Sequence, residues 1–595
     1  NFVYRTDFDV IFERISKIFI LKPKFYKCLY FLIDMRIRGE GKMTDNDKVP
    51  ELTNGEFEEF TKKGVVLVDF FAEWCLSPGT KLTLNPCIAN IETVSKGSKV
   101  LSFDKNFNES FANVKSTFNI VHNQKIDLTT ERGRKVSCTP EHLIHTNKGF
   151  CKAKKISNKH LLSIYPTNSY PEIEDNKNFV IIEKDLRKVG EKLKLNKERY
   201  FNELKEKGLI DIKYNEEKTY VLASLLGFLL TDGSLSLQKN NERSTEFFVG
   251  DKGGSEEVLK DLKFLGYSGE VRKQKIVGEI NGRKFTQNII RIRNSRTSLF
   301  LLLKSIGAVE GKKFFKGVTI PKWIINGPKE IQRVFLQGFL GGDGTRCVIR
   351  VVKRKKGKSY NKPTINDIEF HFASKKLAEI LSKDLKKALT NFGVEIGKIV
   401  IKKEERYVRK DKKDSFLLKI GIKDNLKSAY NYCSIGFKYD NNKKLISAIS
   451  KEYLRERLVN PKTEIVDYNK WIKKYSRGNL LFDKVKEVRK ISGGKYPFIS
   501  LSLDNDTKTF VANDIVHHNC MPCLIMSPVI DELAEKFKGK ARFGKVNVED
   551  APQLANKFNV SSIPNIFLLK NGKVVKQFIG SVSSEELEGK IKEYL

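Results

Sequence analysis

Two pieces of one short motif lie at opposite ends of a long intervening segment. Residues 68–74 read VDFFAEW, an apolar strand pattern that ends in tryptophan, and residues 520–523 read CMPC. Without residues 75–519 the two pieces join into WCMPC, in which two cysteines have the spacing of a redox pair. The intervening segment begins with Cys75 and ends with Asn519. We therefore expect a host domain that is interrupted by a separately folded insert.

The charge of the chain is concentrated in the insert. Almost all of the net +38 falls within residues 75–519, whereas the flanks are nearly neutral. A basic insert in a neutral host suggests that the insert binds a polyanion, and a Lys-rich solvated surface is the alternative. Nine irregularly spaced cysteines in 595 residues argue against a secreted disulfide scaffold and indicate the reducing cytoplasm. The apolar runs are too short to cross a bilayer, so we expect no membrane partner.

The first residues resemble neither a membrane span nor an amphipathic helix. Residues 1–42 begin with Asn1, and codons for Gly39-Glu40 can spell a ribosome-binding sequence just before Met43. We expect that translation starts at Met43 and that the extension is an artefact of gene prediction. A peptide of the cellular protein that maps upstream of Met43 would contradict this expectation.

The flanks carry the pattern of a small α/β domain. The strand over 65–71 is apolar on both faces, as in the centre of a covered sheet, and Asn571-Gly572 marks a hairpin turn. The expected elements are helices over 54–63, 526–537 and 584–595, the last capped by Ser583 or Ser584, and further strands over 541–548, 565–569 and 573–579.

Together with WCMPC, these flanks resemble a thioredoxin. The resemblance implies that Cys520 is the exposed, low-pKa nucleophile at a helix N-terminus and that Cys523 is the resolving thiol. It also implies that Asp69 is the buried proton acceptor for Cys523 and that Pro564 belongs to the cis-proline loop facing the disulfide. The implied partners are disulfide-containing proteins and thioredoxin reductase or another electron donor, without a bound cofactor.

The ends of the insert carry the residue types that self-excision requires. The insert begins CLSPGT at Cys75, contains TPEH at 139–142 and ends TFVANDIVHHN at Asn519. In these segments it resembles an intein. The resemblance implies that Cys75 attacks the carbonyl of Trp74, that Cys520 takes over the acyl group, and that Asn519 cyclises to release the insert.

The same resemblance assigns three helper residues. His142 would bind or protonate the nitrogen of the scissile amide, and Thr139 would hold the geometry. His518 would polarise the carbonyl of Asn519 for cyclisation.

Two positions depart from the intein pattern. Inteins often have an acidic residue near Ser500 and a histidine where Lys508 stands, and a lysine is a poor general acid or base unless its pKa is lowered. Three residues are candidates for the missing helper: His517, Asp504 and Asp506.

An imperfect repeat lies in the middle of the insert. Residues 225–233 read LLGFLLTDG and residues 336–344 read LQGFLGGDG. Helical spacing places apolar side chains on one side, and Gly227 and Gly338 would let two such helices approach closely. A single segment of this kind would be read as an apolar core helix that ends in a tight turn; two of them suggest a paired unit.

The two segments resemble the LAGLIDADG homing endonucleases. The resemblance implies that Asp232 and Asp343 meet at the helix ends and hold Mg²⁺ or another divalent metal. The implied partner is double-stranded DNA, namely the host gene without the insert. The catalytic lysine of that family would be one of Lys312, Lys313 and Lys316.

The expected architecture is therefore multi-domain. An α/β thioredoxin fold is split by an all-β splicing (Hint) domain, which is itself interrupted by an α+β endonuclease with two repeats. The expected ranges are 1–42 for the extension, 43–74 and 520–595 for the thioredoxin, 75–165 and 483–519 for the splicing domain, 166–217 and 456–482 for connectors, and 218–455 for the endonuclease.

The expected function is a self-splicing precursor that yields a thioredoxin and a free DNA endonuclease. The alternatives are a splicing intein with an inactive endonuclease, and a stable unspliced DNA-binding fusion. We expect a monomer. Because Cys520 would serve both splicing and redox chemistry, a Cys520–Cys523 disulfide is expected to stall splicing until it is reduced.

Overall fold

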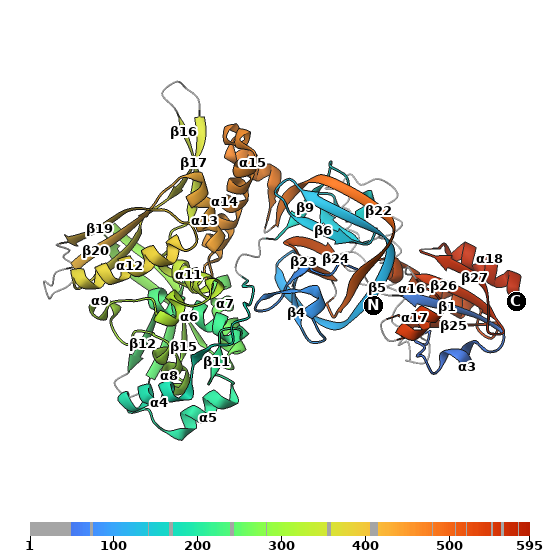
Figure 1. The fold of residues 1–595 in the computed structure, drawn as a ribbon, viewed down its shortest axis with the longest axis horizontal. Coiled ribbons are helices and arrows are strands. Elements are labelled where there is room, and N and C mark those ends of the chain that lie inside the picture. The colour runs from blue at the N-terminus through green and yellow to red at the C-terminus, as the bar shows by residue number, and fades with distance from the viewer. Residues whose placement is uncertain are drawn as a thin grey trace, which may run out of the picture. The chain divides into compact units, whose positions relative to one another are not determined.

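The computed structural model describes residues 49–71, 75–140, 142–165, 170–237, 243–280, 283–353, 359–404, 415–478, 480–505, 507–518, 521–548, 551–560, 564–580 and 582–595. They divide into two compact units, one built mainly from the flanks and the other mainly from the insert (Figure 1). The predicted extension 1–42 and the predicted start at Met43 lie outside the described residues.

The flanks form a mixed sheet with strand β1 (Val65–Phe71) inside it. β1 pairs in parallel with β25 (Ala541–Asn547) and antiparallel with β26 (Asn565–Lys570), which pairs with β27 (Lys573–Ile579). Six of the seven β1 residues are buried, which confirms the predicted central strand. The helices of the flanks are α3 (Phe57–Thr61), α16 (Met521–Lys536), α17 (Pro552–Lys557) and α18 (Ser584–Tyr594).

The local signals in the flanks act as predicted at one turn and one helix cap and differ at one helix. Asn571 and Gly572 have φ angles of 49° and 77°, which confirms the hairpin turn between β26 and β27. The Ser583 side chain accepts a hydrogen bond from the backbone of Glu586 and caps α18. Helix α3 is shorter than the predicted 54–63, because the chain forms a turn before it that closes on the Glu56 carboxylate.

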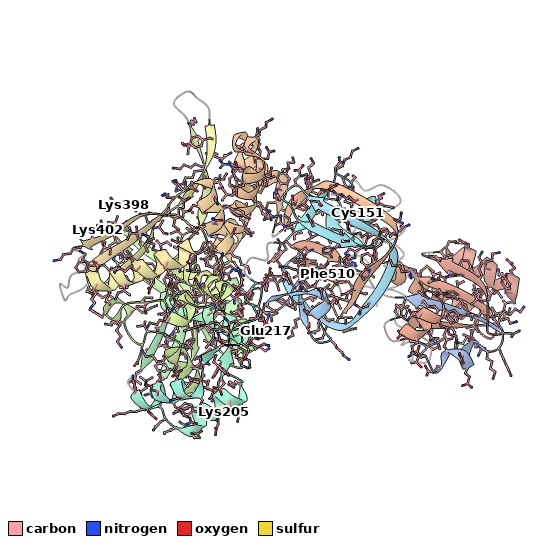
Figure 2. All side chains as sticks on the ribbon, viewed as in Figure 1. Cys151, Lys205, Glu217, Lys398, Lys402 and Phe510 are labelled. Atoms are coloured by element: carbon pink, nitrogen blue, oxygen red, sulfur yellow. The ribbon has the colours of Figure 1, made fainter. Side chains whose placement is uncertain are left out.

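The two ends of the insert form one all-β domain. Its longest strands, β5 (Glu109–Thr130) and β22 (Leu480–Leu503), pair antiparallel, so the beginning and the end of the insert share a sheet. The core includes Leu82, Val136 and Phe510, of which Phe510 is labelled in Figure 2. The other strands are β2 (Lys81–Thr83), β3 (Ile88–Asn90), β4 (Lys99–Phe103), β6 (Lys135–Cys138), β7 (Leu143–Thr146), β8 (Gly149–Lys152), β9 (Leu161–Ile164), β21 (Ser476–Arg477), β23 (Thr509–Ala512) and β24 (Ile515–His518).

The middle of the insert forms an α+β domain with two related halves. Two central helices, α6 (Glu217–Asp232) and α11 (Lys329–Asp343), each begin one half. The first half continues with β12 (Gly233–Leu237), β13 (Arg243–Val249), α7 (Lys252–Phe264), β14 (Glu270–Ile280), β15 (Arg283–Asn294), α8 (Thr297–Ser305), α9 (Lys313–Lys316) and α10 (Lys322–Ile325). The second continues with β16 (Cys347–Lys353), β17 (Ser359–Ile365), β18 (Ile368–Phe372), α12 (Lys375–Thr390), β19 (Ile396–Glu404), β20 (Ser415–Ile422), α13 (Leu426–Ile435) and α14 (Asn441–Val459).

The two halves differ in their sheets. In the first half the strands form one sheet in the order β12-β13-β15-β14. In the second half β16 pairs with β17, and a separate sheet has the order β18-β20-β19. Both halves nevertheless share the order of a helix, strands, a second helix, two strands and a third helix, so the imperfect sequence repeat corresponds to a repeat of elements.

The structure differs from the prediction at the two connectors, which are folded into the middle domain. Residues 166–217 contain β10 (Phe179–Ile181), α4 (Glu183–Lys192), α5 (Glu198–Glu206) and β11 (Ile212–Lys213), and Leu186 and Phe201 belong to the same buried core as α6 and α11. Residues 456–482 contain the end of α14 and α15 (Tyr468–Tyr475), whose Trp471 joins that core. These helices are highly charged, and the burial of their few apolar residues was not predicted from the sequence.

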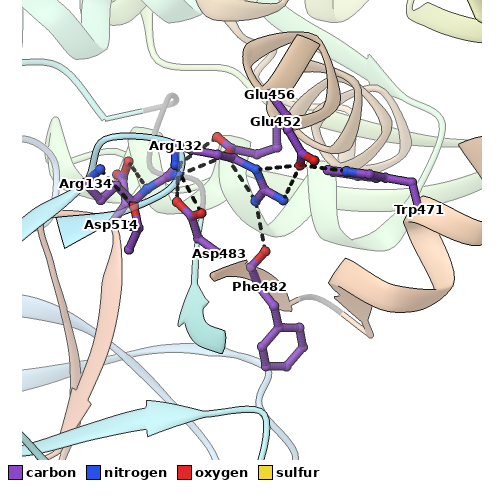
Figure 3. Close-up of polar contacts among 9 residues, drawn as sticks. Arg132, Arg134, Glu452, Glu456, Trp471, Phe482, Asp483 and Asp514 are labelled. Atoms are coloured by element: carbon purple, nitrogen blue, oxygen red, sulfur yellow. Dashed lines mark hydrogen bonds and ion pairs between the residues drawn. The ribbon is translucent and has the colours of Figure 1, made fainter. Parts of the chain in front are cut away.

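A buried network of ion pairs joins the β domain to helix α14 (Figure 3). Arg134, just before β6, donates to both carboxylate oxygens of Glu452 at 2.9 and 2.7 Å. The guanidinium of Arg132 lies 5.0 Å from the centre of the Trp471 ring. We call this the arginine network; its charged members are Arg132, Arg134, Glu452, Glu456, Asp483 and Asp514.

Candidate functional site

The first residue of the insert is held inside the β domain. Leu76 bridges both Cys138 at the end of β6 and Ile499 in β22, and its backbone N–H donates to the Ile499 carbonyl at 2.9 Å. Because the Leu76–Cys138 bridge is antiparallel, Cys75 comes opposite Thr139. Cys75 is buried, with 3% of its surface exposed.

The last strand of the insert ends at the same loop. In β24, His517 pairs with Ile144 and His518 pairs with Leu143, the first residue of β7. Residues 139–142 connect β6 to β7, so this loop lies between the strand that holds Leu76 and the strand that leads to the end of the insert. The sequence-predicted residues at both ends of the insert are thus brought toward one loop.

His142 is fixed by its backbone at the end of this loop. Its N–H donates to the Thr139 carbonyl at 3.1 Å, and its carbonyl accepts from the Ala153 N–H at 2.8 Å. The side chains of both Thr139 and His142 are buried. Burial, followed by the nearby charges of His517 and His518, holds the pKa of His142 well below its usual value of 6.5. His142 is therefore a neutral imidazole at physiological pH.

A second buried histidine contacts His142 directly. His142 Nε2 and His517 Nδ1 lie 2.9 Å apart, and His517 Nε2 lies 3.2 Å from the carbonyl oxygen of Ala512. The His517 ring stacks on Phe510, with ring centres 5.2 Å apart. Burial lowers the pKa of His517 to about 3.

The structure distinguishes among the three candidates for the missing helper residue. Asp504 lies in the loop after β22, where its carboxylate accepts from the backbone N–H and side-chain amide of Asn113 at 2.7 and 2.6 Å. Asp506 lies outside the described residues. Among the three, His517 is the candidate that the structure brings to His142.

The two departures from the intein pattern have structural positions of their own. Lys508 has a φ of 51° and donates to the carbonyl of Leu503 at 2.8 Å, so it closes the loop between β22 and β23. Ser500 is fully buried in β22. The alternation of side chains along β24 puts His517 on the side of the buried Ile515, and this signal favours His517 among the three predicted candidates.

His518 lies on the opposite side of β24 from His517. It is half-buried, and its ring meets the Phe150 ring edge to face with centres 4.7 Å apart. Asn519 and Cys520 follow it in sequence and lie outside the described residues, as does Trp74.

The two central helices of the middle domain cross in close contact at their glycines. A methyl group added at Gly227 would lie 2.2 Å from the carbonyl oxygen of Phe335, and one added at Gly338 would lie 2.0 Å from the carbonyl oxygen of Ser224. Both distances are shorter than van der Waals contact. The predicted close approach of the helices is confirmed.

The same packing brings two carboxylates together at the helix ends. A methyl group at Gly342, next to Asp343, would lie 3.0 Å from Asp232 Oδ2. Burial raises the pKa of both acids, and the charge of Asp232 helps to raise that of Asp343 to about 6. The structure therefore places a like-charged pair at the position that the repeat predicted.

Two lysines flank this pair, one on each helix end. Lys313 Nζ donates to the Leu229 carbonyl at 3.1 Å and to the Thr231 carbonyl, both in the last turn of α6. Lys443 Nζ donates in the same way to the Gly341 carbonyl at 2.7 Å, in the last turn of α11. A cation stabilises the C-terminus of a helix. Of the three predicted lysines the structure selects Lys313, and it adds Lys443, which the sequence analysis missed.

A divalent cation fits the chemistry of the two carboxylates. They are hard oxygen ligands whose mutual repulsion a cation would relieve. The described part of the chain contains no group of three or more His, Cys, Asp or Glu side chains able to hold a metal, so water, phosphate or backbone oxygens would complete the coordination.

In the flanks, Asp69 is a buried acid in β1. It is 1% exposed, and its Oδ1 atom has no hydrogen-bond partner among the described residues. Burial raises its pKa to about 7, against the opposing charge of Lys545. Pro564 is buried at the start of β26, and its carbonyl accepts from Gly580 at 2.8 Å. Cys523 lies in helix α16, with its side chain outside the described set, and the bond before Pro564 involves Ile563, which is also outside it.

Within the described ranges, no helix combines the length and apolar character needed to cross a membrane.

Two family models match this chain. The model described as "Intein splicing domain" matches residues 83–519, and the model described as "Thioredoxin" matches residues 503–593. These matches cover the insert and the C-terminal flank, respectively.

Three curated relatives illustrate the similarity. The DNA-directed RNA polymerase subunit Rpo1N of Methanocaldococcus jannaschii is 29% identical over 422 residues, which are 66% of this chain and 30% of the relative. The tRNA-splicing ligase RtcB of Pyrococcus abyssi is 26% identical over 480 residues, 77% of this chain and 49% of the relative. The chain thus spans less than half the length of either relative. A thioredoxin of Chlorobaculum thiosulfatiphilum is 37% identical over 93 residues, 16% of this chain and 84% of the relative.

Proposed function

Because the chain belongs to the intein splicing domain family and to the thioredoxin family, we propose that it is a self-splicing precursor. In this proposal residues 75–519 excise themselves and join Trp74 to Cys520. The observation that carries it is the convergence at the loop of residues 139–142, which the chain approaches from Leu76 at one end of the insert and from His518 at the other.

The reaction is a series of acyl transfers. Cys75 Sγ attacks the carbonyl carbon of Trp74, the C–N bond breaks, and the thiol proton ends on the freed amine of Cys75. Cys520 Sγ then displaces Cys75 Sγ, which regains a proton. The side-chain nitrogen of Asn519 attacks the Asn519 carbonyl, so the insert leaves as a succinimide and the amine of Cys520 is freed. That amine attacks the thioester and forms the Trp74–Cys520 amide.

Three of the described residues are positioned to assist these acyl transfers. His142, neutral and buried, is the proton carrier of the first step, and Thr139 holds its backbone. His518, half-buried at the end of β24, is the group that polarises the carbonyl of the following Asn519.

The joined flanks would form a thioredoxin that acts in the cytoplasm as a monomer. Cys520 is the nucleophile toward disulfide-containing proteins, and Cys523 resolves the mixed disulfide. Asp69, whose pKa is raised to about 7, accepts the proton of Cys523. Pro564 precedes β26 in the loop that would face the disulfide. Thioredoxin reductase or another electron donor would return the protein to its dithiol form.

The excised insert would be a DNA endonuclease of the LAGLIDADG type. The observation that favours this second activity is the Asp232–Asp343 pair with its flanking Lys313 and Lys443. A bound Mg²⁺ would activate water and stabilise the leaving oxygen of a phosphodiester. Asp232 and Asp343 would hold the ion, with the ammonium groups of Lys313 and Lys443 within electrostatic reach of the carboxylates. The double-stranded substrate would be the host gene without the insert.

Intact-mass spectrometry tests the splicing proposal. We expect the full chain, expressed under reducing conditions, to give the masses of residues 75–519 and of the joined flanks. Asn519→Ala should give neither, while Asp343→Asn, a change in the middle domain of the same chain, should splice normally. A single full-length mass from the unchanged protein would overturn the proposal and favour a stable unspliced fusion.

The redox hypothesis and the nuclease have separate tests. If a Cys520–Cys523 disulfide stalls splicing, the unchanged chain should splice more slowly without reductant, whereas Cys523→Ser should not. Equal splicing rates of the unchanged chain with and without reductant would contradict this hypothesis. The excised insert should cleave a duplex that carries the joined gene in the presence of Mg²⁺, and Asp343→Asn should not. Binding of that duplex without cleavage would identify an inactive endonuclease.

A further inference from the structure

The contact between His142 and His517 contains information about where their protons lie. His517 Nε2 lies 3.2 Å from the Ala512 carbonyl oxygen in hydrogen-bond geometry. A carbonyl oxygen can only accept, so His517 Nε2 must carry a proton. The backbone of β23 therefore selects the tautomer of His517.

This tautomer determines the direction of the next hydrogen bond. Burial keeps His517 neutral, because its pKa is lowered to about 3, and its Nδ1 is therefore unprotonated. His142 Nε2, 2.9 Å away, must then be the donor in the contact between the two rings. Since His142 is also neutral, its remaining nitrogen, Nδ1, carries a lone pair.

We propose that His517 is a positioning residue for splicing, which holds His142 in the Nε2–H tautomer so that Nδ1 is the atom that moves the proton. This inference rests on the proposed splicing function. His142 Nδ1 takes the Sγ proton of Cys75 as the thiolate attacks Trp74. It then gives that proton to the Cys75 nitrogen as the Trp74–Cys75 amide bond breaks, so His142 is neutral again when the thioester has formed.

The alternative is that His517 only fills space in the core. Its ring stacks on Phe510, a contact that a phenylalanine at 517 could also make. Phenylalanine would lack an acceptor for the proton on His142 Nε2, so that proton would be left buried without its present partner. Asparagine at 517 can place its side-chain oxygen near the position of His517 Nδ1, which preserves the acceptor in a smaller side chain. The two substitutions therefore distinguish the effect of losing the hydrogen-bond acceptor at residue 517 from the effect of changing the side-chain volume there.

The first experiment observes the tautomer directly. Nitrogen NMR spectra of the full chain with Cys75→Ala and Asn519→Ala, labelled on its seven histidines, distinguish protonated from unprotonated ring nitrogens. His142→Gln in the same background assigns the His142 signals. We expect a proton on Nε2 of His142 and none on Nδ1. A proton on Nδ1 of His142 would overturn the inference even if the protein splices.

The second experiment measures the first acyl shift alone. In the full chain with Asn519→Ala and Cys520→Ala, the acyl group cannot pass on to residue 520, so a thiol nucleophile cleaves the thioester between Trp74 and Cys75, and the rate is followed by intact mass. His517→Phe should slow this cleavage at least tenfold, whereas His517→Asn should keep it within a few-fold of the unchanged rate. His142→Ala should abolish it. Thermal unfolding of each variant shows whether it is folded.

The outcomes distinguish the inference from the proposed function. If His142→Ala gives no cleavage and a folded His517→Phe reacts at the unchanged rate, splicing stands and the positioning role is overturned. If the parent protein itself gives no cleavage, the proposed function fails, and the NMR result still decides the tautomer. If His517→Phe does not fold, the NMR result and His517→Asn decide the role.

Discussion

Arg134 and Glu452 form a two-point ion pair between the β domain and the middle domain of the insert. The two N–H···O distances are 2.9 and 2.7 Å, and both side chains are nearly inaccessible to water, with 5% and 1% exposed. Arg134 also pairs with Asp514, at the turn that leads into β24, at 3.3 Å. The same guanidinium thus holds the starts of β6 and β24, the two strands that lead to His142 and His517.

Removing one charge of this pair should destabilise the whole insert. Glu452→Gln keeps the shape but removes the two-point partner of the buried Arg134, which retains Asp483 and Asp514. A buried charge left without any partner typically costs about 3 to 5 kcal/mol, so we expect a loss below that range. Urea unfolding of the full chain with Cys75→Ala and Asn519→Ala would measure this loss. Glu131→Gln is the matched control, because Glu131 pairs with Lys484 at the surface, with both about two-fifths exposed, and should change little. Equal stability of the two variants would contradict the prediction.

The glycine contact between α6 and α11 predicts a specific loss of endonuclease activity. Gly227→Ala would press a methyl group against the Phe335 carbonyl and force the helices apart, at a cost of about 1 to 3 kcal/mol. DNA cleavage should be lost, because Asp232 and Asp343 would no longer meet. Gly250→Ala is the control, since no atom lies within 4 Å of a methyl group there. If Gly227→Ala cleaves DNA as well as Gly250→Ala does, the helix contact is not required.

The lysine at the end of α6 predicts a change in the pH dependence of DNA cleavage. Burial and the charge of Asp232 raise the pKa of Asp343 to about 6, and the charge of Lys313 opposes this rise. Lys313→Met should raise this pKa further, so the acidic limb of the rate profile moves to higher pH. The cleavage rate below pH 6 should fall about tenfold for every pH unit that the limb moves. Lys316→Met changes an exposed lysine of the same short helix and should leave the profile unchanged. Identical profiles for the two variants would rule out this role.

Asp69 predicts how the stability of the joined flanks depends on pH. Its pKa is about 7 in the folded protein and ordinarily 3.8, so the folded state binds the proton more tightly than the unfolded state does. The free energy of unfolding should therefore fall by a few kcal/mol in total between about pH 4 and 7. Above pH 7 it should change no further through this group. Asp69→Asn should remove this fall and be the more stable form at pH 8, while losing disulfide reductase activity.

Urea unfolding of the joined product at pH 5 and pH 8 tests whether stability falls with rising pH, as the raised pKa of Asp69 predicts. Glu593→Gln is the control, because Glu593 pairs with Lys590 and is 52% exposed, and it should leave the slope with pH unchanged. A pH slope that persists in Asp69→Asn would assign the effect to another group.

Local signals in the sequence predicted the parts of this molecule that depend on local rules. The Asn571-Gly572 turn and the Ser583 cap follow from backbone sterics and hydrogen bonding within a few residues. The close approach at Gly227 and Gly338 was predicted because the same segment with a central glycine occurs twice. The packing of the connectors was not predicted, because the burial of Leu186 and Phe201 depends on helices far along the chain.

The roles of two site residues, His517 among the predicted helpers and Lys443, which was not predicted, depend on partners distant in sequence. His517 matters because β24 pairs with β7 and so faces His142, a relation between strands rather than a motif. Lys443 lies on α14, a helix with no signature, and its role appears only when the second half of the middle domain is compared with the first. In each case the residue is plain in the sequence, but its contact can be predicted only from the strand register or the pseudo-symmetry of the fold.

Helix α14 has a consequence for how such a gene can evolve. Its first turn carries Lys443 beside the two carboxylates, and later turns carry Glu452 and Glu456 of the arginine network. A deletion that discards the middle domain also discards two of the four acids of this network, and leaves Asp483 and Asp514 beside the arginines. A smaller descendant of this insert would keep two buried arginines with fewer acids around them, so loss of the middle domain would favour a later replacement of one arginine.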